Sequence, residues 1–360
     1  MEIPLGQRLR ELPGPLLLTG HTGFKGTWMT LLLEHLKIPV IGFSLEPEKG
    51  SLFNRAHRVG SIPEKFADIR DYEALGSFID LHRPSSIIHM AAQPLVLKSY
   101  QNPRETFDIN VMGTVNLLDI GFKKDFIEAI IIVTTDKVYR NDNSGQAFVE
   151  SDPLEGKDPY SASKVGTEAV VAAWQQISSI SRGPKVVAVR AGNVIGGGDF
   201  AENRIIPDLI RGLINKKAVE IRSPNSTRPW QHVLDPISGY LCAIENALNG
   251  GHLPSLNFGP ISENWPVKIL VSQIRSHLED KGIKLEIEIG SGSDTNIEST
   301  ALNLNSSLAQ THLNWRPLWD QEKSIVKTID WWCDLIFKNE SASRLTIENI
   351  KEYLDEERNS

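Results

Sequence analysis

Cysteines and long hydrophobic runs are scarce in this sequence of 360 residues. Its two cysteines, Cys242 and Cys333, are too few for a disulfide framework and too far apart for a zinc knuckle. We therefore expect a reducing, cytoplasmic environment and no catalytic metal. No stretch reaches the roughly 18 apolar residues that a membrane span needs, and charges and prolines interrupt residues 1–15. The sequence predicts neither a membrane segment nor a targeting segment.

Positive charge is also in short supply. The chain has 38 Lys and Arg against 45 Asp and Glu, giving a formal net charge of -7 and a pI near 5.8. Such a chain has no broad positive field to attract a polyphosphate backbone, so we do not expect a nucleic-acid partner. Hydrophobic residues make up 40% of the sequence, enough for a full core in one large domain or two coupled ones.

The sequence does contain an alternation of short apolar runs with longer helical patterns. The runs are typical of strands buried on both faces of a parallel sheet, and occur at residues 16–18, 40–43, 87–90, 130–133, 186–189 and 256–258. Helical periodicity lies between them, at residues 27–36, 72–81, 103–122 and 160–177. This order predicts an α/β protein with a Rossmann-type doubly wound parallel sheet, in which ligands bind beyond the carboxyl ends of the strands.

The first apolar run leads into a glycine-rich loop and then a helix. The loop comprises Gly20, His21, Thr22, Gly23, Phe24, Lys25 and Gly26. Glycines let the backbone turn sharply and approach a pyrophosphate, while the helix N-terminus offers free N–H groups and a positive dipole end. At the first strand-to-helix turn of an alternating chain, this pattern predicts a dinucleotide site rather than a plain turn.

The second predicted strand ends at Ser44, where NAD-preferring folds usually place an acidic residue for the adenosine ribose. NAD and NADP therefore both stay open, and we favour NAD. Lys25, Arg55 and Arg58 are either contacts for a 2′-phosphate or ordinary solvated cations. Further cofactor contacts are expected at Asp68 and Ile69, and directly after the apolar run at residues 87–90, at Ala91, Ala92 and Gln93.

The composition changes after about residue 195, where three consecutive glycines precede polar segments punctuated by proline. We expect a dinucleotide-binding domain over residues 1–190, with sheet elements returning at about residues 230–258. Residues 191–229 and 259–345 are expected to form a smaller substrate-binding α/β region that caps this domain. Residues 346–360 are expected to be a tail, and the apolar pattern from residue 339 onward predicts an amphipathic helix there.

Tyr160 and Lys164, four residues apart, fall on one face of the helix predicted at residues 160–177. A phenol, with an ordinary pKa of about 10, is a poor base at neutral pH. A nearby ammonium lowers that pKa and lets the tyrosine take a proton from a sugar hydroxyl. Such pairs are common on helices, but downstream of a nucleotide loop this one predicts a hydride-transfer site.

Thr135, Asp136 and Lys137 follow the strand predicted at residues 130–133, at the edge where the substrate should lie. The Thr135 hydroxyl can hydrogen-bond the reacting oxygen, which completes a set with Tyr160 and Lys164. Asp136 and Lys137 add an ionisable pair that simple oxidoreduction does not require. An exposed, solvated turn is the alternative interpretation of that pair.

These motifs resemble the extended short-chain dehydrogenase/reductases that modify nucleotide sugars, within them the hexose 4,6-dehydratases, and most closely those that act on CDP-glucose. The matching stretches are residues 20–26, 44–47, 89–96, 196–200, 203–208 and 228–235, and the resemblance spans roughly residues 14–320. The chain departs from the dTDP-glucose and GDP-mannose enzymes at Lys137, where they carry glutamate. The identity of the base at sugar C5 therefore stays open.

The resemblance implies dehydration of CDP-D-glucose to CDP-4-keto-6-deoxy-D-glucose with the dinucleotide recycled. Tyr160 would take the C4 hydroxyl proton as hydride leaves C4, and Asp136 would protonate the departing C6 hydroxyl, which requires a raised pKa. Lys137 is the candidate base at C5, and the hydride returns to C6. The alternatives are a nucleotide-sugar 4-epimerase, which has no use for an acid at C6, and a non-catalytic dinucleotide-sensing protein.

Several residues are candidates for binding the nucleotide sugar. They are Gln93, Ser99, Asn193, Arg204, Ile206, Arg222, Arg228 and His232. Cationic side chains among them suit the diphosphate, although Arg222 is equally explained as a surface charge and His232 as a core histidine. The resemblance also implies a homodimer formed through the helices at residues 103–122 and 160–177, to which Leu117 and Trp174 either contribute contacts or belong as ordinary core residues.

Overall fold

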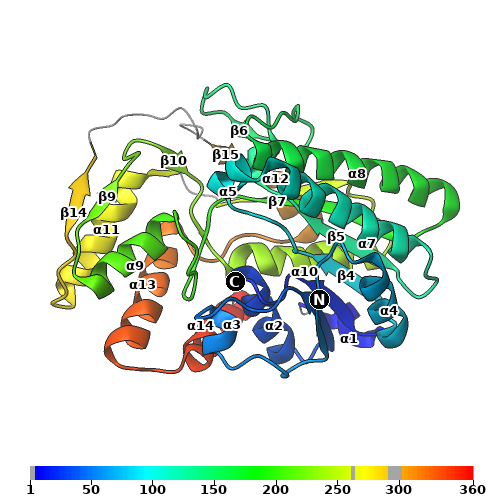
Figure 1. The fold of residues 1–360 in the computed structure, drawn as a ribbon, viewed down its shortest axis with the longest axis horizontal. Coiled ribbons are helices and arrows are strands. Elements are labelled where there is room, and N and C mark those ends of the chain that lie inside the picture. Colours follow the sequence, from blue (N-terminus) through cyan, green and yellow to red (C-terminus); the bar gives the residue numbers. More distant parts are fainter. Residues whose placement is uncertain (1–4, 261–263, 291–301, 360) are drawn as a thin grey trace.

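The computed structural model describes residues 5–260, 264–290 and 302–359. At its centre lies a seven-stranded parallel sheet in the order β12-β7-β5-β4-β1-β2-β3 (Figure 1). Its strands are β1 (Leu16–Thr19), β2 (Val40–Ser44), β3 (Glu64–Phe66), β4 (Ser86–His89), β5 (Ala129–Val133), β7 (Lys185–Ala191) and β12 (Ser255–Phe258). The predicted Rossmann-type doubly wound sheet is confirmed.

The strands form where the sequence is apolar on both faces. Every residue of β1, β2, β4 and β5 is buried, and each buried valine, leucine or isoleucine side chain contributes about 1.5–3 kcal/mol relative to exposure. The exception is the edge strand β3, whose Glu64 and Phe66 are half-buried and whose Lys65 is exposed. Apolar runs do not predict this strand, because an edge position buries too little of it.

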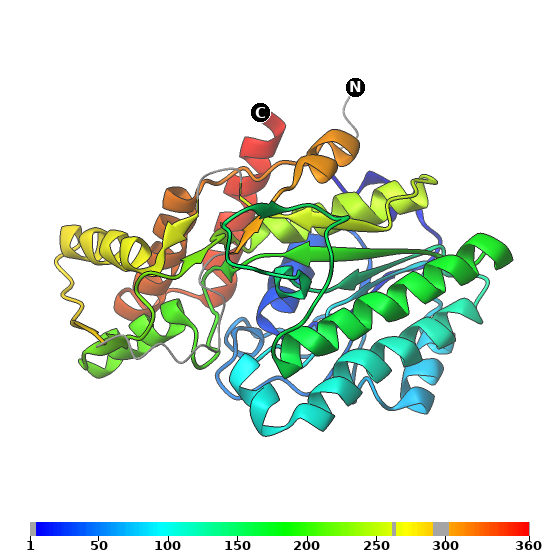
Figure 2. The same cartoon turned by 90° about the horizontal axis from the view of Figure 1, so that it is seen from above.

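Helices cover both faces of the sheet (Figure 2). One layer contains α4 (Tyr72–His82), α7 (Gly113–Phe122) and α8 (Pro159–Ser181), with α7 packed against both others. The opposite layer contains α2 (Phe24–His35), α10 (Leu234–Leu248) and α14 (Ala342–Asn359). The helix predicted at residues 103–122 is made of α6 (Pro103–Phe107), a π-helical turn (Asp108–Met112) and α7. Shorter helices are α1 (Gln7–Glu11), α3 (Leu52–Arg55), α5 (Val96–Gln101) and α12 (Ser307–Leu313).

A second region extends beyond the end of β7, on the left of Figure 1. It contains α9 (Ile205–Asn215), β9 (Val219–Ile221), α11 (Val267–Asp280), β14 (Ile287–Ile289) and α13 (Gln321–Phe337), with β9 and β14 paired in parallel. Three two-residue pairings connect it to the main sheet region: β8 (Val194–Ile195) with β11 (Gln231–His232), β10 (Thr227–Arg228) with β13 (Trp265–Pro266), and β6 (Ala147–Phe148) with β15 (Asn303–Leu304).

The C-terminal segment forms the predicted helix, α14, and this helix is part of the core layer. It packs against α2, α3 and α13, and its Tyr353 is 1% exposed. The Tyr353 hydroxyl donates to Asp235 Oδ1 at 2.9 Å, and the backbone N–H of Leu318 donates to the same oxygen at 2.9 Å. Asp235 is completely buried, and burial raises the pKa of its carboxyl to about 7.

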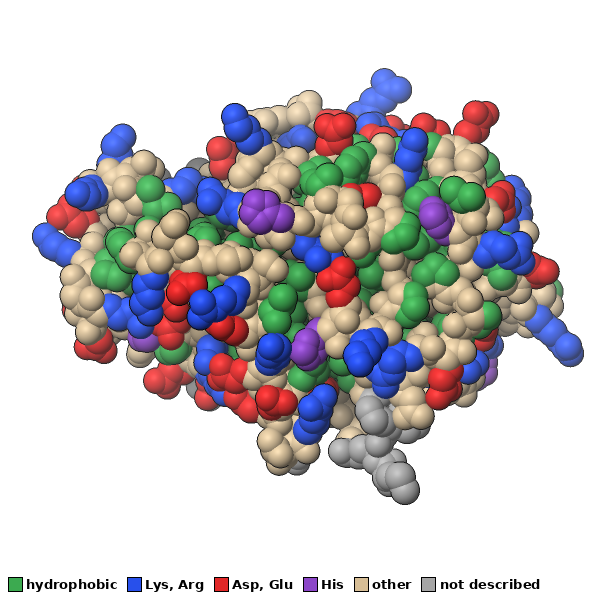
Figure 3. All heavy atoms as spheres, turned by 90° about the horizontal axis from the view of Figure 1, so that it is seen from below, with side chains coloured by type: hydrophobic (Ala, Val, Ile, Leu, Met, Phe, Trp, Pro, Cys, Tyr) green, Lys and Arg blue, Asp and Glu red, His purple; other side chains and the backbone are tan. Residues whose placement is uncertain are grey.

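One face of the molecule (Figure 3) carries no broad patch of a single charge sign. Basic and acidic side chains are intermingled on the face drawn in Figure 3. Over the described ranges, no helix combines the length and apolarity that crossing a bilayer takes. In the same ranges, no three His, Cys, Asp or Glu side chains gather as metal ligands would.

Of the two alternatives for Leu117, the structure shows ordinary core packing. Leu117 is 0% exposed and packs in the apolar layer between the sheet and α7, so its side chain cannot reach a partner. Trp174 is half-buried against the same layer. The exposed apolar residues of these helices are instead Phe107, Met112, Ile177 and Ile180.

The Asp235 carboxyl makes folding stability depend on pH. Its pKa is about 7 in the folded chain and about 3.9 in an unfolded one, so the folded state binds more protons between these values and the unfolding free energy falls as pH rises. Asp235→Asn keeps the acceptor oxygen and removes the titration. We expect wild type to lose about 2 kcal/mol more than Asp235→Asn between pH 5 and pH 7.5 in urea unfolding. Equal losses in both proteins would contradict this.

Candidate active site

The glycine loop packs tightly on the end of β4. Gly20 has a φ of +72°, and a Cβ there would lie 2.7 Å from the backbone nitrogen of Ala91. A Cβ on Gly26 would lie 2.2 Å from the Gly20 carbonyl oxygen. Gly23 is the N-cap of α2 and donates its N–H to Gly20 O at 3.1 Å. Side chains are thus excluded where the loop must turn. The N-terminus of α2 lies beyond the carboxyl end of β1, where its free N–H groups can bind an anion.

The other side chains predicted near the adenosine end mostly bind one another. The His21 ring is buried, lies 2.9 Å from the Glu64 carboxylate through Nε2, and occupies the space that Gly42 leaves by lacking a side chain. Thr22 and Ser44 share a hydrogen bond of 2.8 Å between their hydroxyls, which ties the loop to the end of β2. Only the backbone of His21 is therefore free to face a ligand.

Asp68 and Ile69 follow β3. Hydrogen bonds from Arg70 lower the pKa of the Asp68 carboxyl, and the two side chains form an ion pair of 2.7 Å. Ile69 is 5% exposed in the core, where Gly113 leaves room for its side chain. An ionised carboxylate thus lies close to the edge where the adenine was predicted.

Lys25 is buried rather than solvated. Its Nζ lies 3.4 Å from the hydroxyl oxygen of Tyr240 on α10. Burial, together with the nearby charges of Lys164 and Arg204 and against that of Asp136, lowers the pKa of its ammonium to about 7. Lys25 therefore belongs to the group of polar side chains around Asp136. Arg58, the second candidate, is buried and paired with Glu34 at 2.6 Å.

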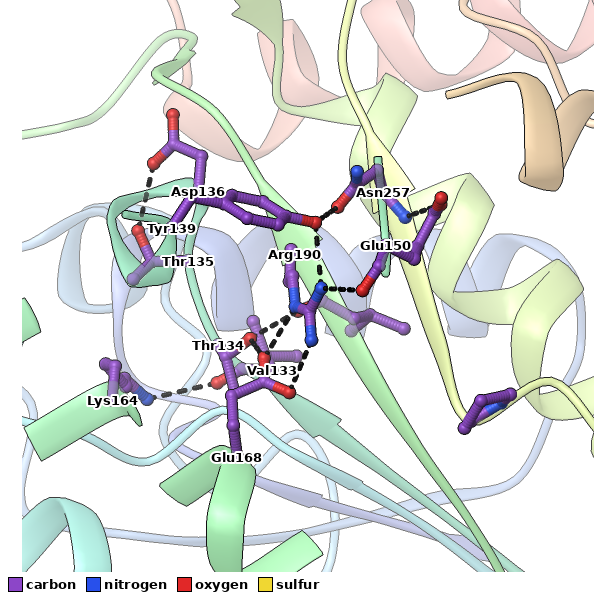
Figure 4. A network of polar contacts seen from close by, with 12 residues as sticks. Val133, Thr134, Thr135, Asp136, Tyr139, Glu150, Lys164, Glu168, Arg190 and Asn257 are labelled. Carbon is purple, nitrogen blue, oxygen red and sulfur yellow. Dashed lines mark hydrogen bonds and ion pairs between the residues drawn. The ribbon is translucent and has the colours of Figure 1, made fainter. Parts of the chain in front are cut away.

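Thr135, Asp136 and Tyr160 converge from two elements. Thr135 caps a short 3₁₀ turn (Asp136–Val138) that follows β5, and its hydroxyl donates to Asp136 Oδ1 at 3.0 Å (Figure 4). Tyr160 lies in the first turn of α8, which Asp158 caps by accepting from the N–H of Ser161 at 3.0 Å. A hydrogen bond with Thr135 lowers the pKa of the Tyr160 phenol, although not enough to offset burial.

Asp136 has the electrostatic environment that a proton donor needs. It is 2% exposed, and burial raises the pKa of its carboxyl to about 6 despite the opposing charges of Lys137 and Arg228. Among the described residues, its Oδ2 atom has no hydrogen-bond partner. The charge of the adjacent Lys137, which opposes protonation, is outweighed by desolvation. With a pKa of about 6, about a tenth of this carboxyl is protonated at pH 7, which suits it to general acid chemistry.

Tyr160 and Lys164 differ from expectation in their electrostatics. Burial raises the pKa of the Tyr160 phenol to about 12, so the expected lowering by the ammonium is wrong for the protein alone. Lys164 Nζ donates to the carbonyl oxygen of Val133 at 3.0 Å. Burial also lowers the pKa of this ammonium, to about 8. Burial is the largest influence on both pKa values, and it favours the neutral form of each group.

Two of the predicted substrate residues, Arg228 and Arg204, lie near enough to this centre to affect its pKa values. Arg228 on β10 is 6% exposed, and its charge lowers the pKa of Asp136. Arg204 pairs with Asp199 at 2.9 Å, and its charge lowers the pKa of Tyr160. Ile206 is buried at the start of α9, and half-buried Asn193 precedes β8.

The remaining predicted substrate residues make contacts elsewhere in the fold or lie on the surface. Ser99 is completely buried and donates to Val96 O at 2.6 Å, and the Gln93 amide bonds to Leu95 and Thr106. His232 is 0% exposed between the rings of Trp28 and Trp319, where burial lowers its pKa to about 3. Arg222 is exposed at the end of β9.

Sequence reasoning missed Tyr240 as a member of the site. Its hydroxyl faces Lys25, and the charges of Tyr160 and Asp136 raise the pKa of its phenol further than burial does alone. A tyrosine in the middle of an apolar helix carries no local signal. Only the packing of α10 beneath the glycine loop shows it.

Comparisons with known proteins agree with this geometry. The chain matches the NAD dependent epimerase/dehydratase family over residues 16–259. It is 38% identical over 322 residues to a CDP-glucose 4,6-dehydratase of Salmonella typhimurium, covering 87% of this chain and 89% of that protein. Its fold resembles that of the dTDP-glucose 4,6-dehydratase of Bacillus anthracis in complex with NAD, with a TM-score of 0.74, 23% identity, and coverage of 92% and 99%. It also resembles the UDP-glucose 4-epimerase of Thermotoga maritima with UDP-glucose, with a TM-score of 0.77, 20% identity, and coverage of 89% and 99%.

The desolvated ammonium of Lys25 should lower stability. Because its pKa is about 7 in the folded chain and about 10.4 when unfolded, the unfolded state binds more protons between these values and the unfolding free energy rises with pH. We expect Lys25→Met to be about 1 kcal/mol more stable than wild type at pH 7, with the difference shrinking toward pH 10. Thermal unfolding of both proteins measures this, with Lys65→Met as the control at an exposed position. A less stable Lys25→Met at pH 7 would overturn it.

Proposed function

This chain belongs to the NAD dependent epimerase/dehydratase family, and on that basis we propose that it is a nucleotide-sugar 4,6-dehydratase that converts CDP-D-glucose to CDP-4-keto-6-deoxy-D-glucose. One observation carries the proposal. A buried carboxyl with a raised pKa, Asp136, is hydrogen-bonded to Thr135, which in turn contacts the phenol of Tyr160. Removal of water from a sugar needs an acid beside the base that starts the oxidation.

The residues around the glycine loop suit NAD. Gly20, Gly23 and Gly26 leave the backbone bare where a pyrophosphate would approach the N-terminus of α2. Bound there, NAD would supply a hydride acceptor for the oxidation at C4, a hydride donor for the later reduction, and a positive charge in its oxidised form. The Ser44 hydroxyl shares a hydrogen bond with the Thr22 hydroxyl. Because β2 ends at this serine and not at a carboxylate, NADP is retained as the alternative cofactor.

Tyr160 is assigned as the base for the C4 hydroxyl. Its phenol lies within hydrogen-bonding reach of Thr135, so both side chains can bind the same reacting oxygen. The phenol needs positive charge nearby before it can ionise, because burial alone holds its pKa at about 12. The charge of Arg204 lowers this pKa in the protein alone, and Lys164, one helical turn away, is proposed to add to it when the cofactor is bound.

Asp136 is assigned as the acid that protonates the departing C6 hydroxyl. A pKa of about 6 leaves the carboxyl close to the operating pH, where transfer of its proton is efficient. Lys137, the next residue, is half-buried and is the candidate base for the C5 proton. The ketone formed at C4 acidifies that C–H bond, which reduces the strength of base required.

Arg228 and Arg204 are assigned to the substrate diphosphate. Arg228 is buried and its charge acts on Asp136, and Arg204 is near enough to Tyr160 to act on its phenol. A guanidinium binds a phosphate through two parallel hydrogen bonds, so each can orient the sugar as well as attract it. The half-buried side chain of Asn193 is proposed as a third contact.

We also propose that the chain forms a homodimer through α6, α7 and α8. Phe107 and Met112 are 40% and 48% exposed, and Ile177 and Ile180 on α8 are 44% and 76% exposed. Apolar side chains exposed on neighbouring helices are better buried against a second copy. Light scattering should give twice the monomer mass, and a monomer at micromolar concentration would contradict this proposal.

A 4-epimerase is the second candidate, because the comparisons include a UDP-glucose 4-epimerase of the same fold. Incubation with CDP-glucose, dTDP-glucose, UDP-glucose and GDP-mannose separates the two activities. We expect a 4-keto-6-deoxy product, detected by its absorbance in alkali, from CDP-glucose first. A C4 epimer as the only product would show an epimerase, and no conversion of any substrate would leave a dinucleotide-binding protein without this chemistry.

Asp136→Asn tests the assigned acid. The amide keeps the size and the hydrogen bond with Thr135 but cannot donate a proton to a leaving hydroxyl. We expect formation of the 4-keto-6-deoxy product to fall by about 10²- to 10⁴-fold, while C4 oxidation, followed as NADH absorbance in a single turnover, persists. Product formation at the wild-type rate would remove Asp136 from this role.

A further inference from the structure

A buried polar network connects Lys164 with Glu168 and Arg190 (Figure 4), and none of the steps above uses its Glu168 or Arg190. It joins α8 to the last residues of β5 at two points, one helical turn apart. Lys164 Nζ donates to Val133 O at 3.0 Å, and the Thr134 hydroxyl donates to Glu168 Oε1 at 2.6 Å. These bonds hold the helix of Tyr160 against the strand end that continues into Thr135.

Arg190 on β7 completes the network from the other side. Its Nε donates to Glu168 Oε1 at 2.8 Å and its Nη2 to Glu168 Oε2 at 2.9 Å, a two-point contact between side chains that are 4% and 6% exposed. Its Nη1 donates to Tyr139 Oη at 2.8 Å and to Glu150 O at 3.1 Å. The ion pair is therefore fully desolvated and its hydrogen bonds are nearly all satisfied.

Stability alone is a weak reason to bury such a pair. Replacing a buried ion pair by packed apolar residues is often neutral or stabilising, because desolvation offsets most of the attraction. The network instead fixes the position of α8 relative to the end of β5. It also places a carboxylate four residues beyond Lys164, on the helix face that carries Tyr160.

The charges around Lys164 give that carboxylate a second effect. Lys25 of α2 and His89 of β4 lie close enough to interact with the ammonium, and burial lowers the pKa of His89 to about 3, which keeps it neutral. Glu168 opposes the loss of the Lys164 proton that burial favours. Without Glu168, the guanidinium of Arg190 would be left as an unbalanced positive charge on the same side.

We propose that Glu168, held by Arg190, is a positioning residue for the dehydration reaction: it keeps Lys164 charged and fixes the helix of Tyr160 at the end of β5. The inference rests on the proposed function, since its readout is the oxidation at C4. It assigns a role in the reaction to two residues that touch neither the sugar nor the dinucleotide.

Glu168→Gln tests the charge. The amide retains an oxygen for the Thr134 hydroxyl and removes the negative charge beside Lys164. We expect the alkaline limb of the pH profile of kcat to move to lower pH by about one unit or more, because Lys164 then loses its proton earlier. The matched control is Glu150→Gln, the same change at the far side of the network, where Glu150 accepts from Asn257 N at 2.8 Å. Its alkaline limb should stay within about 0.2 pH unit of wild type.

A purely structural role would lower the melting temperature and reduce kcat equally at every pH without moving the limb, and that result overturns the proposal. Thr134→Val tests the geometry separately, because it leaves the Glu168–Arg190 pair intact and removes one hydrogen bond. We expect kcat to fall about tenfold with KM unchanged. If Glu168→Gln does not fold, the Thr134→Val variant decides alone: a kcat equal to that of wild type overturns the proposal. If wild type converts no nucleotide hexose, the proposed function fails instead.

Discussion

The separation between the carboxyl end of β5 and the first turns of α8 is the constraint on which the active site depends. Thr135 and Asp136 leave the strand there, and Tyr160 must meet them from the helix. Parallel pairing of β5 with β4 and β7 fixes the strand, and two buried hydrogen bonds to Val133 and Thr134 fix the helix. Because none of these contacts involves a reacting atom, the geometry is set before substrate binds.

Desolvation is the second organising influence, and it acts on every ionisable group of the site in the direction of neutrality. It raises the pKa of Asp136 and Tyr160 and lowers that of Lys25 and Lys164. For Asp136 the result favours the proposed role, since an acid must hold its proton. For Tyr160 it opposes the proposed role, since a base must lose its proton. The site therefore needs a local positive charge that is retained. A buried carboxylate next to Lys164 helps because it opposes the loss of the ammonium proton.

The sequence predicted the backbone of this protein better than the directions of its side chains. Six of the seven strands of the sheet, the glycine loop and the helix of Tyr160 follow from periodicity and glycine spacing, because these depend on local residues. The polar edge strand β3 and the π-helical turn before α7 have no local signal. Ser99, Gln93 and His232 were expected in the substrate pocket. Inside the fold, Ser99 instead bonds to Val96, Gln93 bonds to Leu95, and His232 packs against Trp319. Which neighbour a side chain finds is decided by tertiary packing.

The fold cannot distinguish a dehydratase from an epimerase, since proteins of both names share it. Both reactions begin by removing a proton from the C4 hydroxyl, so both need a tyrosine on α8 and a threonine after β5. Only loss of water also needs a proton donor for the hydroxyl that leaves C6. Asp136 is proposed for this role because its second carboxyl oxygen has no hydrogen-bond partner among the described residues and burial raises its pKa to about 6. A buried carboxyl without a hydrogen-bond partner lowers the stability of the fold, so one with no chemical role is expected to be paired or solvated. A proton donor, by contrast, must leave one oxygen available to its substrate.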